Sequence, residues 1–308
     1  MNNRLSVRIG EVGLKNPLLT ASGTFGFARE YSELFDVSLL GGIVVKGLTL
    51  QPKEGNPPPR IAETPSGLLN AIGLQNPGVD WFLAKELPAL RRIDTKVIAN
   101  IAGSTPEEFA EIAKLLEAEA GIAALELNIS CPNVRQGGMA FGVHPESAAK
   151  VTEVVKKNTA LPVWVKLSPN VTDITEIAKA VEAAGADAIT LINTLLGMAI
   201  DPEKRRPVLG NIFGGLSGPA VKPVALRMVW QVYEAVKIPI IGMGGVTSAR
   251  DVLEFIMAGA SVVAIGTGLF TQPLAPVGIL QELEEFLTKE DVAQITELTG
   301  VAHNFSAR

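Results

Sequence analysis

The stretch that decides the fold is Leu125-Glu126-Leu127-Asn128-Ile129-Ser130-Cys131-Pro132-Asn133, a largely apolar strand that ends in polar groups. Pro132 ends the strand because proline cannot donate to a sheet ladder. Cys131 is the only cysteine of the chain. A lone cysteine is more often a small buried hydrophobe, but this one follows the strand into a polar loop, where functional residues concentrate. The stretch therefore predicts a buried strand followed by a loop that carries a reactive thiol.

Similar apolar runs recur along the chain and alternate with amphipathic segments of helix length. The predicted strands are Pro17–Ser22, Gly42–Lys46, Lys96–Ile101, Ala124–Ile129, Pro162–Leu167, Ala188–Asn193, Ile238–Gly242 and Ser261–Gly266. The predicted helices include Pro106–Ala120, Pro145–Lys157, Asp173–Ala184, Pro219–Val236 and Ser248–Ala258. Such alternation indicates an α/β fold with a parallel sheet covered on both faces. Eight units predict a (β/α)8 TIM barrel.

An open, doubly wound sheet is the alternative arrangement of these elements. It normally carries a dinucleotide-binding fingerprint after its first strand. Here that turn reads Ala21-Ser22-Gly23-Thr24-Phe25-Gly26, which lacks the required glycine spacing. The 308 residues show no internal repeat and no low-complexity linker, so we expect a single barrel domain over residues 1–308.

Composition and charge exclude several classes of protein. Hydrophobic residues make up 47% of the chain and charged residues 19%, which indicates a large buried core. The net charge of -5 offers no basic surface for nucleic acid. One cysteine excludes an internal disulfide, a four-thiolate iron–sulfur cluster and a cysteine-rich zinc site made by this chain alone. Since no apolar leader or membrane-length apolar run occurs, we expect a soluble, cytoplasmic protein that binds no membrane.

Two connections are longer than the roughly 2–6 residues usual between a strand and the following helix. Residues 47–77 are rich in proline and include Pro57-Pro58-Pro59, and residues 193–218 include Arg205-Arg206 and several glycines. Long loops of this kind are often functional. We expect residues 47–77 to form a stiff cover over the C-terminal face of the barrel, with a solvated insertion as the alternative for either segment.

Polar residues stand at the ends of five neighbouring predicted strands. These residues are Lys46, Asn100, Asn128, Lys166 and Asn193. The C-terminal ends of barrel strands meet at one face, where active sites lie. A lysine buried in an apolar strand is costly without a partner. A snorkelling side chain is the alternative for either lysine, but the coincidence at two strand ends indicates an anionic ligand.

The last two predicted strands run into glycines, at Gly242-Met243-Gly244-Gly245 and Gly266-Thr267-Gly268. Glycines let a phosphate approach backbone N–H groups, and the loops after strands seven and eight are the frequent phosphate site of barrels. Two ligands fit these features. Flavin mononucleotide (FMN) would place its ring edges against the amides, with a lysine to stabilise the reduced ring. A sugar phosphate would instead react with Lys166 as the Schiff-base nucleophile of an aldolase.

At these residues the chain resembles the catalytic subunits of class 1B dihydroorotate dehydrogenases over nearly its whole length. The motifs that carry the resemblance are Val45-Lys46-Gly47, Gly55-Asn56-Pro57-Pro58-Pro59-Arg60, Asn70-Ala71-Ile72-Gly73-Leu74-Gln75-Asn76, Leu127–Asn133, Val165-Lys166-Leu167, Ile192-Asn193-Thr194 and Gly242–Gly245. The resemblance implies oxidation of (S)-dihydroorotate to orotate in de novo pyrimidine biosynthesis, with one FMN bound per chain at the top of the barrel.

The resemblance also implies roles for individual residues. Cys131 is expected to be the catalytic base that removes the C5 proton while a hydride leaves C6 for the flavin, which requires the thiol to lose its own proton. Lys166 would face the reduced ring. The implied substrate-binding residues are Lys46, Asn70, Ala71, Ile72, Gly73, Leu74, Asn128, Asn193 and Thr194. The implied FMN contacts are Ser22, Lys46, Gly47, Asn100, Asn128, Lys166, Ile192, Gly218, Gly244, Gly245, Gly266 and Thr267.

Within this family the resemblance points to the NAD-linked subclass. Quinone-reducing relatives carry a membrane-associating N-terminal extension and a serine base, which this chain lacks. The fumarate-linked class 1A shares the cysteine and is the alternative, although residues 71–76 are more similar to the NAD-linked class. Because the chain shows no NAD or FAD fingerprint, the resemblance implies an electron-transfer partner subunit that carries FAD and a 2Fe-2S cluster. We expect a heterotetramer built around a homodimer of this chain.

Three other classes of protein are weighed against this interpretation. A flavin-dependent tRNA dihydrouridine synthase would use the same barrel, but it should show a basic surface and an added helical RNA-binding domain. A Schiff-base aldolase would bind no flavin, and a non-catalytic scaffold would hold FMN without turnover. The two histidines, His144 and His303, are not expected to be catalytic, because one precedes a predicted helix and the other lies near the C-terminus.

Overall fold

The computed structural model describes residues 4–130 and 141–305. Its centre is a closed barrel of parallel strands in the order β10-β15-β16-β3-β4-β7-β8-β9. These strands are β3 (Leu18–Thr20), β4 (Gly42–Val44), β7 (Lys96–Ile101), β8 (Ile122–Asn128), β9 (Val163–Lys166), β10 (Ala188–Leu191), β15 (Ile240–Met243) and β16 (Val262–Ile265). Each overlaps one predicted strand, so the predicted (β/α)8 barrel is confirmed.

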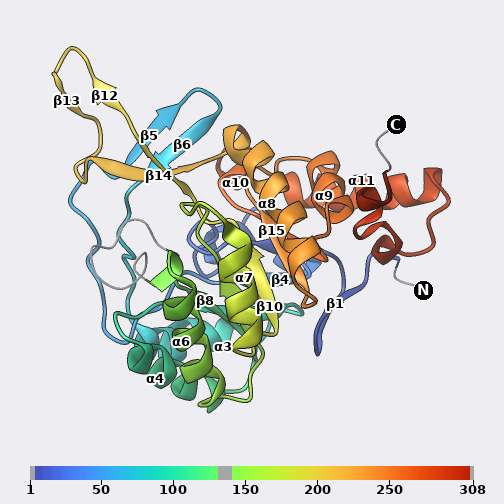
Figure 1. Ribbon diagram of the computed structural model, residues 1–308, viewed down its shortest axis with the longest axis horizontal. Helices are drawn as coiled ribbons and strands as arrows, with labels where there is room; N and C mark the ends of the chain where they lie inside the picture. The colour runs from blue at the N-terminus through green and yellow to red at the C-terminus, as the bar shows by residue number, and fades with distance from the viewer. Residues whose placement is uncertain (1–3, 131–140, 306–308) are drawn as a thin grey trace.

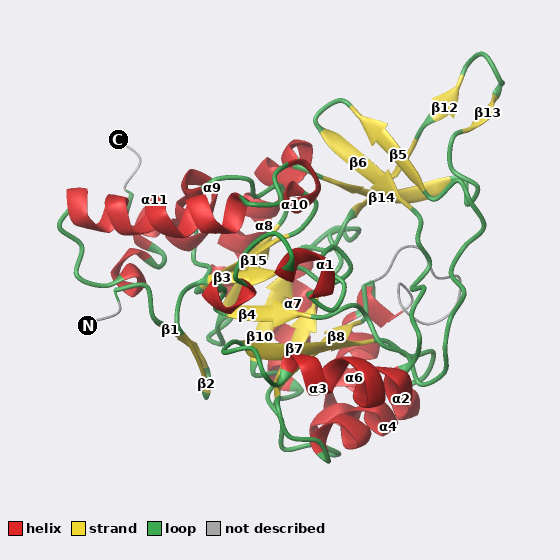
Figure 2. Cartoon of the chain, turned by 180° about the vertical axis from the view of Figure 1, so that it is seen from behind, coloured by secondary structure: helices red, strands yellow, loops and turns green. Residues whose placement is uncertain are grey.

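Helices surround the barrel, as Figures 1 and 2 show from opposite sides. The longer ones are α4 (Pro106–Glu117), α6 (Pro145–Lys156), α7 (Ile174–Ala183), α8 (Lys222–Ala235), α9 (Ala249–Met257) and α11 (Ala275–Lys289). Short helices are α1 (Arg29–Ser32), α2 (Val79–Trp81), α3 (Leu87–Leu90) and α10 (Gly268–Thr271). The five helices predicted from periodicity all form, within a few residues of their predicted ends.

Helix α4 illustrates why these segments are helical. Thr105 caps it by accepting a hydrogen bond from the Glu108 backbone, and Pro106 occupies the first turn, where no donor is lost. Phe109, Ile112 and Leu116 recur at helical spacing and are buried. The amphipathic stripe therefore fixes which face of the helix packs on the barrel.

The two long connections pair with each other to form a second sheet, which we call the cover sheet. Its strand order is β11-β14-β6-β5. The strands are β5 (Ile61–Thr64), β6 (Gly67–Asn70), β11 (Leu195–Met198) and β14 (Phe213–Ser217). Strands β6 and β14 run antiparallel, with Asn70 opposite Gly215. The expected cover of residues 47–77 is thus one half of a sheet that residues 193–218 complete.

The cover sheet lies to one end of the barrel in both views (Figures 1 and 2). Its strands belong to the connections that follow β4 and β10. In the barrel order these two strands are four places apart in either direction, so they stand on opposite sides of the barrel. The cover sheet therefore joins two connections that leave opposite sides of the barrel.

Two small hairpins lie outside the barrel and the cover sheet. They are β1 (Val7–Ile9) with β2 (Val12–Leu14) and β12 (Ile200–Asp201) with β13 (Arg206–Pro207). Over the described ranges, no helix has the length and apolar character needed to cross a lipid bilayer. The single-domain organisation stays a prediction.

Candidate functional site

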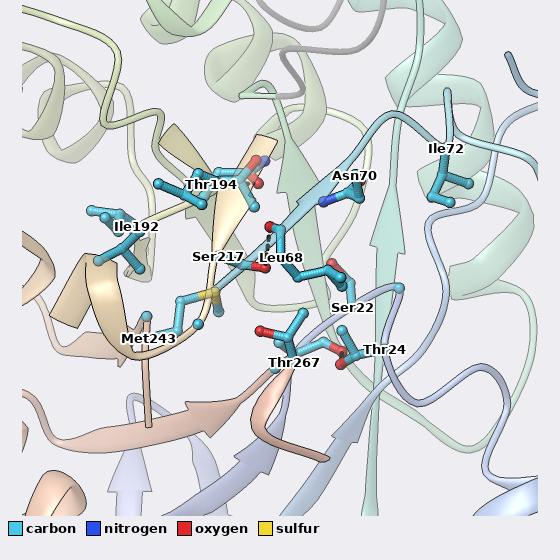
Figure 3. Close-up of a pocket in the computed structure, with 18 of the residues that line it drawn as sticks. Ser22, Thr24, Leu68, Asn70, Ile72, Ile192, Thr194, Ser217, Met243 and Thr267 are labelled. Carbon is cyan, nitrogen blue, oxygen red and sulfur yellow. Dashed lines mark hydrogen bonds between the residues drawn. The ribbon is translucent and has the colours of Figure 1, made fainter. Parts of the chain in front are cut away.

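A cavity of about 350 Å³ lies where the C-terminal ends of the barrel strands meet the cover sheet. This volume falls within the range of about 300–1,000 Å³ found for ligand sites. Figure 3 shows that side chains from the barrel, such as Ser22, Thr194 and Thr267, and from the cover sheet, such as Leu68 and Ser217, surround the same space. The fold thus encloses a ligand site between two layers of different origin.

Nearly all of the predicted contact residues line this cavity. Those with predicted FMN contacts are Ser22, Lys46, Gly47, Asn100, Asn128, Lys166, Ile192, Gly218, Gly244, Gly245, Gly266 and Thr267. The cavity-lining residues among the predicted substrate contacts are Lys46, Asn70, Ile72, Gly73, Leu74, Asn128, Asn193 and Thr194. Their roles toward a ligand stay predictions. Cys131, the predicted base, lies outside the described residues.

Ala71 is the predicted substrate residue that the described cavity does not include. Its side chain is fully buried in a small apolar cluster with Ala62, Leu69 and Leu209. Its backbone N–H donates to the Arg60 carbonyl oxygen at 2.7 Å, which continues the pairing of β5 with β6. Successive side chains of an extended chain point to opposite faces, so Ala71 faces the apolar cluster while Asn70 faces the cavity. The backbone and side chain of Ala71 thus stabilise the cover sheet.

Several other residues that line the cavity were not among the predicted ligand contacts. They are Ala21, Gly23, Thr24, Ile61, Leu68, Leu216, Ser217, Val221, Met243, Val246, Gly268 and Phe270. Ile61, Leu68, Leu216 and Ser217 belong to the cover sheet, whose strand pairing no local motif announces. The apolar side chains of Ile61, Leu68 and Leu216 are the one signal in the sequence that could have marked these positions.

Two lysines bring positive charge to the cavity. Lys166, at the end of β9, is only 5% exposed, and its Nζ donates to Ser22 Oγ at 3.2 Å. Over the described ranges, no carboxylate lies within ion-pair distance of Lys166. Burial lowers the pKa of Lys46, and the nearby Arg60 guanidinium lowers it further. Both ammonium groups are therefore placed to gain from a ligand with anionic character.

Amide side chains form a chain of hydrogen bonds along the same wall, which we call the relay. Asn193 Nδ2 donates to Ser130 Oγ at 2.9 Å, and Ser130 Oγ donates to Asn128 Oδ1 at 3.4 Å. Asn128 Nδ2 donates to Asn100 Oδ1 at 3.4 Å, and Asn100 Nδ2 donates to Glu126 Oε1 at 2.7 Å. The relay links the ends of β7, β8 and β10 and holds their amides in fixed orientations.

Glycine turns lie at another part of the cavity wall. Gly245 has φ of 74°, and a Cβ there would lie 2.8 Å from the Gly218 carbonyl oxygen, so only glycine fits. Asp251 Oδ2 accepts from the backbone N–H groups of Thr247 and Ser248 at 2.9 and 3.0 Å. Burial raises the pKa of Asp251, but hydrogen bonds, first from Lys222, outweigh this and lower it. An ionised Asp251 thus stiffens the turn after β15.

The two histidines lie away from the cavity, as expected for non-catalytic residues. His144 stands at the N-cap of α6. His303 stacks on Trp230 with ring centroids 3.6 Å apart, and its Nε2 lies 3.1 Å from the Ala258 carbonyl oxygen. Neither lines the described cavity, and their non-catalytic roles stay predictions.

The fold and the cavity define a (β/α)8 barrel with a polar site between the strand ends and a covering sheet, at the face where barrel enzymes have their active sites. Comparison with known proteins narrows this class. The family model described as Dihydroorotate dehydrogenase matches residues 4–287. The chain therefore belongs to the dihydroorotate dehydrogenase family of oxidoreductases.

Several known proteins align with this chain over nearly their whole length. A protein of Desulforamulus reducens is 61% identical over 98% of this chain and 100% of its own, and one of Desulforudis audaxviator is 57% identical over 98% and 99%. A protein of Anoxybacillus flavithermus is 56% identical over 98% and 97%. Each of these relatives is named dihydroorotate dehydrogenase B (NAD(+)), catalytic subunit.

Proposed function

We propose that the chain oxidises (S)-dihydroorotate to orotate, a step of de novo pyrimidine biosynthesis, with FMN bound in the described cavity. One observation supports the proposal most strongly: two lysines and the asparagines of the relay line a single cavity. The chain also belongs to the dihydroorotate dehydrogenase family. Family membership favours this activity over the aldolase, tRNA-modifying and scaffold alternatives.

The residues that line the cavity fit FMN. Lys166 is a nearly buried cation whose described hydrogen-bond partner is a neutral hydroxyl, which suits a ring that gains negative charge on reduction. Glycine turns at Gly218, Gly244–Gly245 and Gly266 suit a phosphate, since glycine allows close approach to backbone N–H groups. When bound, FMN supplies a hydride acceptor.

The chain's own residues supply binding, orientation and proton transfer. We assign Cys131, as thiolate, to take the C5 proton of dihydroorotate. Lys46, Asn70, Asn128, Asn193 and Thr194 would hold the substrate, because its carboxylate and ring amides match an ammonium group and planar amides. Residues of the cover sheet line the cavity and would limit the access of water to the reacting carbon atoms.

We further propose that electrons leave for NAD through a partner subunit. Relatives carry both NAD(+) and catalytic subunit in their names, and this chain lacks a nucleotide fingerprint for NAD. The partner would hold FAD and a 2Fe-2S cluster in a heterotetramer around a homodimer of this chain. The fumarate-linked class stays the second candidate within the family.

The experiment that tests this function is the visible flavin spectrum of the purified chain, mixed anaerobically with dihydroorotate. We expect rapid bleaching of the flavin bands, because hydride transfer requires only this chain. A coloured protein that does not bleach would contradict the substrate assignment. A colourless protein that FMN cannot reconstitute would contradict the cofactor assignment. It would favour the alternative, a Schiff-base aldolase that acts on a sugar phosphate.

A further inference from the structure

Glu126 is a buried acid in the barrel wall to which the proposed reaction assigns no role. It lies on β8, opposite Asn100 on β7, and is 0% exposed. Oε1 accepts the hydrogen bond from Asn100, while Oε2 has no hydrogen-bond partner among the described residues. No lysine or arginine in the described part of the chain pairs with it. Burial of a carboxylate with so few partners is costly, so stability does not explain it.

The position of Glu126 gives the relay a direction. An asparagine amide has nearly the same shape when turned over, but the turn exchanges its donor and its acceptor. A carboxylate oxygen accepts, so Asn100 must point Nδ2 at Glu126 and Oδ1 at Asn128. Asn128 must then point Nδ2 at Asn100 and Oδ1 at Ser130. The acceptor at Glu126 therefore fixes the amides of Asn100 and Asn128, while the Thr194 backbone N–H fixes that of Asn193.

The direction decides what the cavity offers to a ligand. The oxygens of Asn100 and Asn128 already accept bonds within the relay, and Asn193 Oδ1 accepts from the Thr194 backbone N–H at 2.7 Å. Each amide nitrogen has two hydrogens and uses one in the relay. The remaining N–H groups of Asn128 and Asn193 belong to cavity-lining residues. The wall therefore presents donors, which match the carbonyl oxygens of a pyrimidine ring.

We propose that Glu126 is a positioning residue that fixes the direction of the relay and so selects a ligand with hydrogen-bond acceptors at this wall. The proposal rests on the proposed function for the identity of the ligand. It involves no step of the chemistry, because Glu126 does not line the described cavity and reaches it through Asn100.

The test uses the full chain with FMN bound and orotate as the probe, followed through the change in flavin absorbance. Glu126→Gln keeps the size of the side chain but allows it to donate as well as accept, so the amides of Asn100 and Asn128 can turn over. We expect orotate affinity to fall about tenfold, the loss of one well-placed hydrogen bond. Thr190→Val is the matched control, since Thr190 is also buried in the barrel without a described hydrogen-bond partner and is not in the relay. It should leave orotate affinity within about twofold.

A double-mutant cycle separates positioning from general damage. Glu126 and Asn128 are joined through Asn100, so the double variant Glu126→Gln with Asn128→Ala should lose less affinity than the product of the two single losses. Losses that multiply, or an unchanged affinity in Glu126→Gln, would overturn the proposal. If unsubstituted protein shows no response to orotate, the proposed function fails. The same cycle on the dissociation constant of FMN, measured by fluorescence, then tests the relay, because Asn100 and Asn128 line the cavity for either ligand.

Discussion

The charge of Lys46 destabilises the folded chain without a ligand but favours the binding of an anionic ligand. Burial and Arg60 lower its pKa, so the charged form is disfavoured in the folded chain. The unfolded chain then binds the proton more tightly, and the folded chain is destabilised below the lowered pKa, with relief as pH rises through it. An anionic ligand offsets this penalty, since it interacts favourably with the charged form.

We predict that orotate affinity falls as pH rises through the lowered pKa of Lys46. The fall should begin at a lower pH than it would for a lysine with the ordinary pKa of about 10.4. The charged ammonium binds the carboxylate, and the neutral amine does not. Titration of orotate into the FMN-loaded protein between about pH 6 and 10 measures the fall. Lys46→Arg should move it to higher pH, because arginine stays protonated. The same profile in both proteins would contradict the assignment.

A second prediction concerns Cys131. Cys131→Ala should leave FMN bound and slow its reduction by dihydroorotate by at least about 100-fold, which is the usual contribution of a positioned base. Stopped-flow absorbance under anaerobic conditions measures this rate. Cys131→Ser tests the thiol itself, since a hydroxyl of similar size is far less acidic. Reduction at the unsubstituted rate in the alanine variant would remove Cys131 from the role of base.

At the residue scale, the sequence predicts the site where chemistry and position coincide. Lysines and asparagines at strand ends were visible because polar groups are rare in buried strands. Ala71 was placed among substrate contacts through its motif, but strand alternation turns its side chain into an apolar cluster. Glu126 was not singled out, because one acid inside an apolar run gives no sign of its hydrogen-bond partner on the neighbouring strand.

At the scale of elements, the barrel strands were predictable and the cover sheet was not. Barrel strands such as β9 are buried along their whole length and read as continuous apolar runs. Strands β6 and β14 pair across a sequence separation of 145 residues, from Asn70 to Gly215. Connections rich in proline and glycine predict a cover over the barrel. They do not predict its strand register, because each connection pairs with another that is distant in sequence.

The cover sheet leads to a third prediction, at Gly215. A Cβ at this position would lie 2.0 Å from Thr194 Oγ1, so Gly215→Ala must displace the Thr194 side chain. We expect orotate binding to weaken about tenfold, the loss of one hydrogen bond, while FMN binding changes little. Gly197→Ala on β11 is the control, because its Cβ would meet the Leu69 Cδ2 methyl at 3.0 Å and no polar group. Equal losses in both variants would point to general disturbance of the sheet.

At the scale of the whole molecule, the described cavity holds one redox centre in the proposed function. We predict that the purified chain oxidises dihydroorotate with an artificial dye as acceptor but forms no NADH. Addition of the electron-transfer subunit should restore NADH formation, which absorbance at the nicotinamide band would follow. NADH formation by the chain alone, at the rate seen with dye, would contradict the need for a partner. Activity with fumarate instead would support the class 1A alternative.

The arrangement of the cover sheet has a consequence for the order in which the molecule assembles. Its two halves follow β4 and β10, which stand on opposite sides of the barrel. A half-barrel intermediate can hold one half of the sheet but has no partner strand for it. Pairing of β6 with β14 joins residues 145 apart in sequence, and contacts of such long separation form slowly. A nascent chain therefore cannot complete the cover over the ligand site before β14 (Phe213–Ser217) has been synthesised.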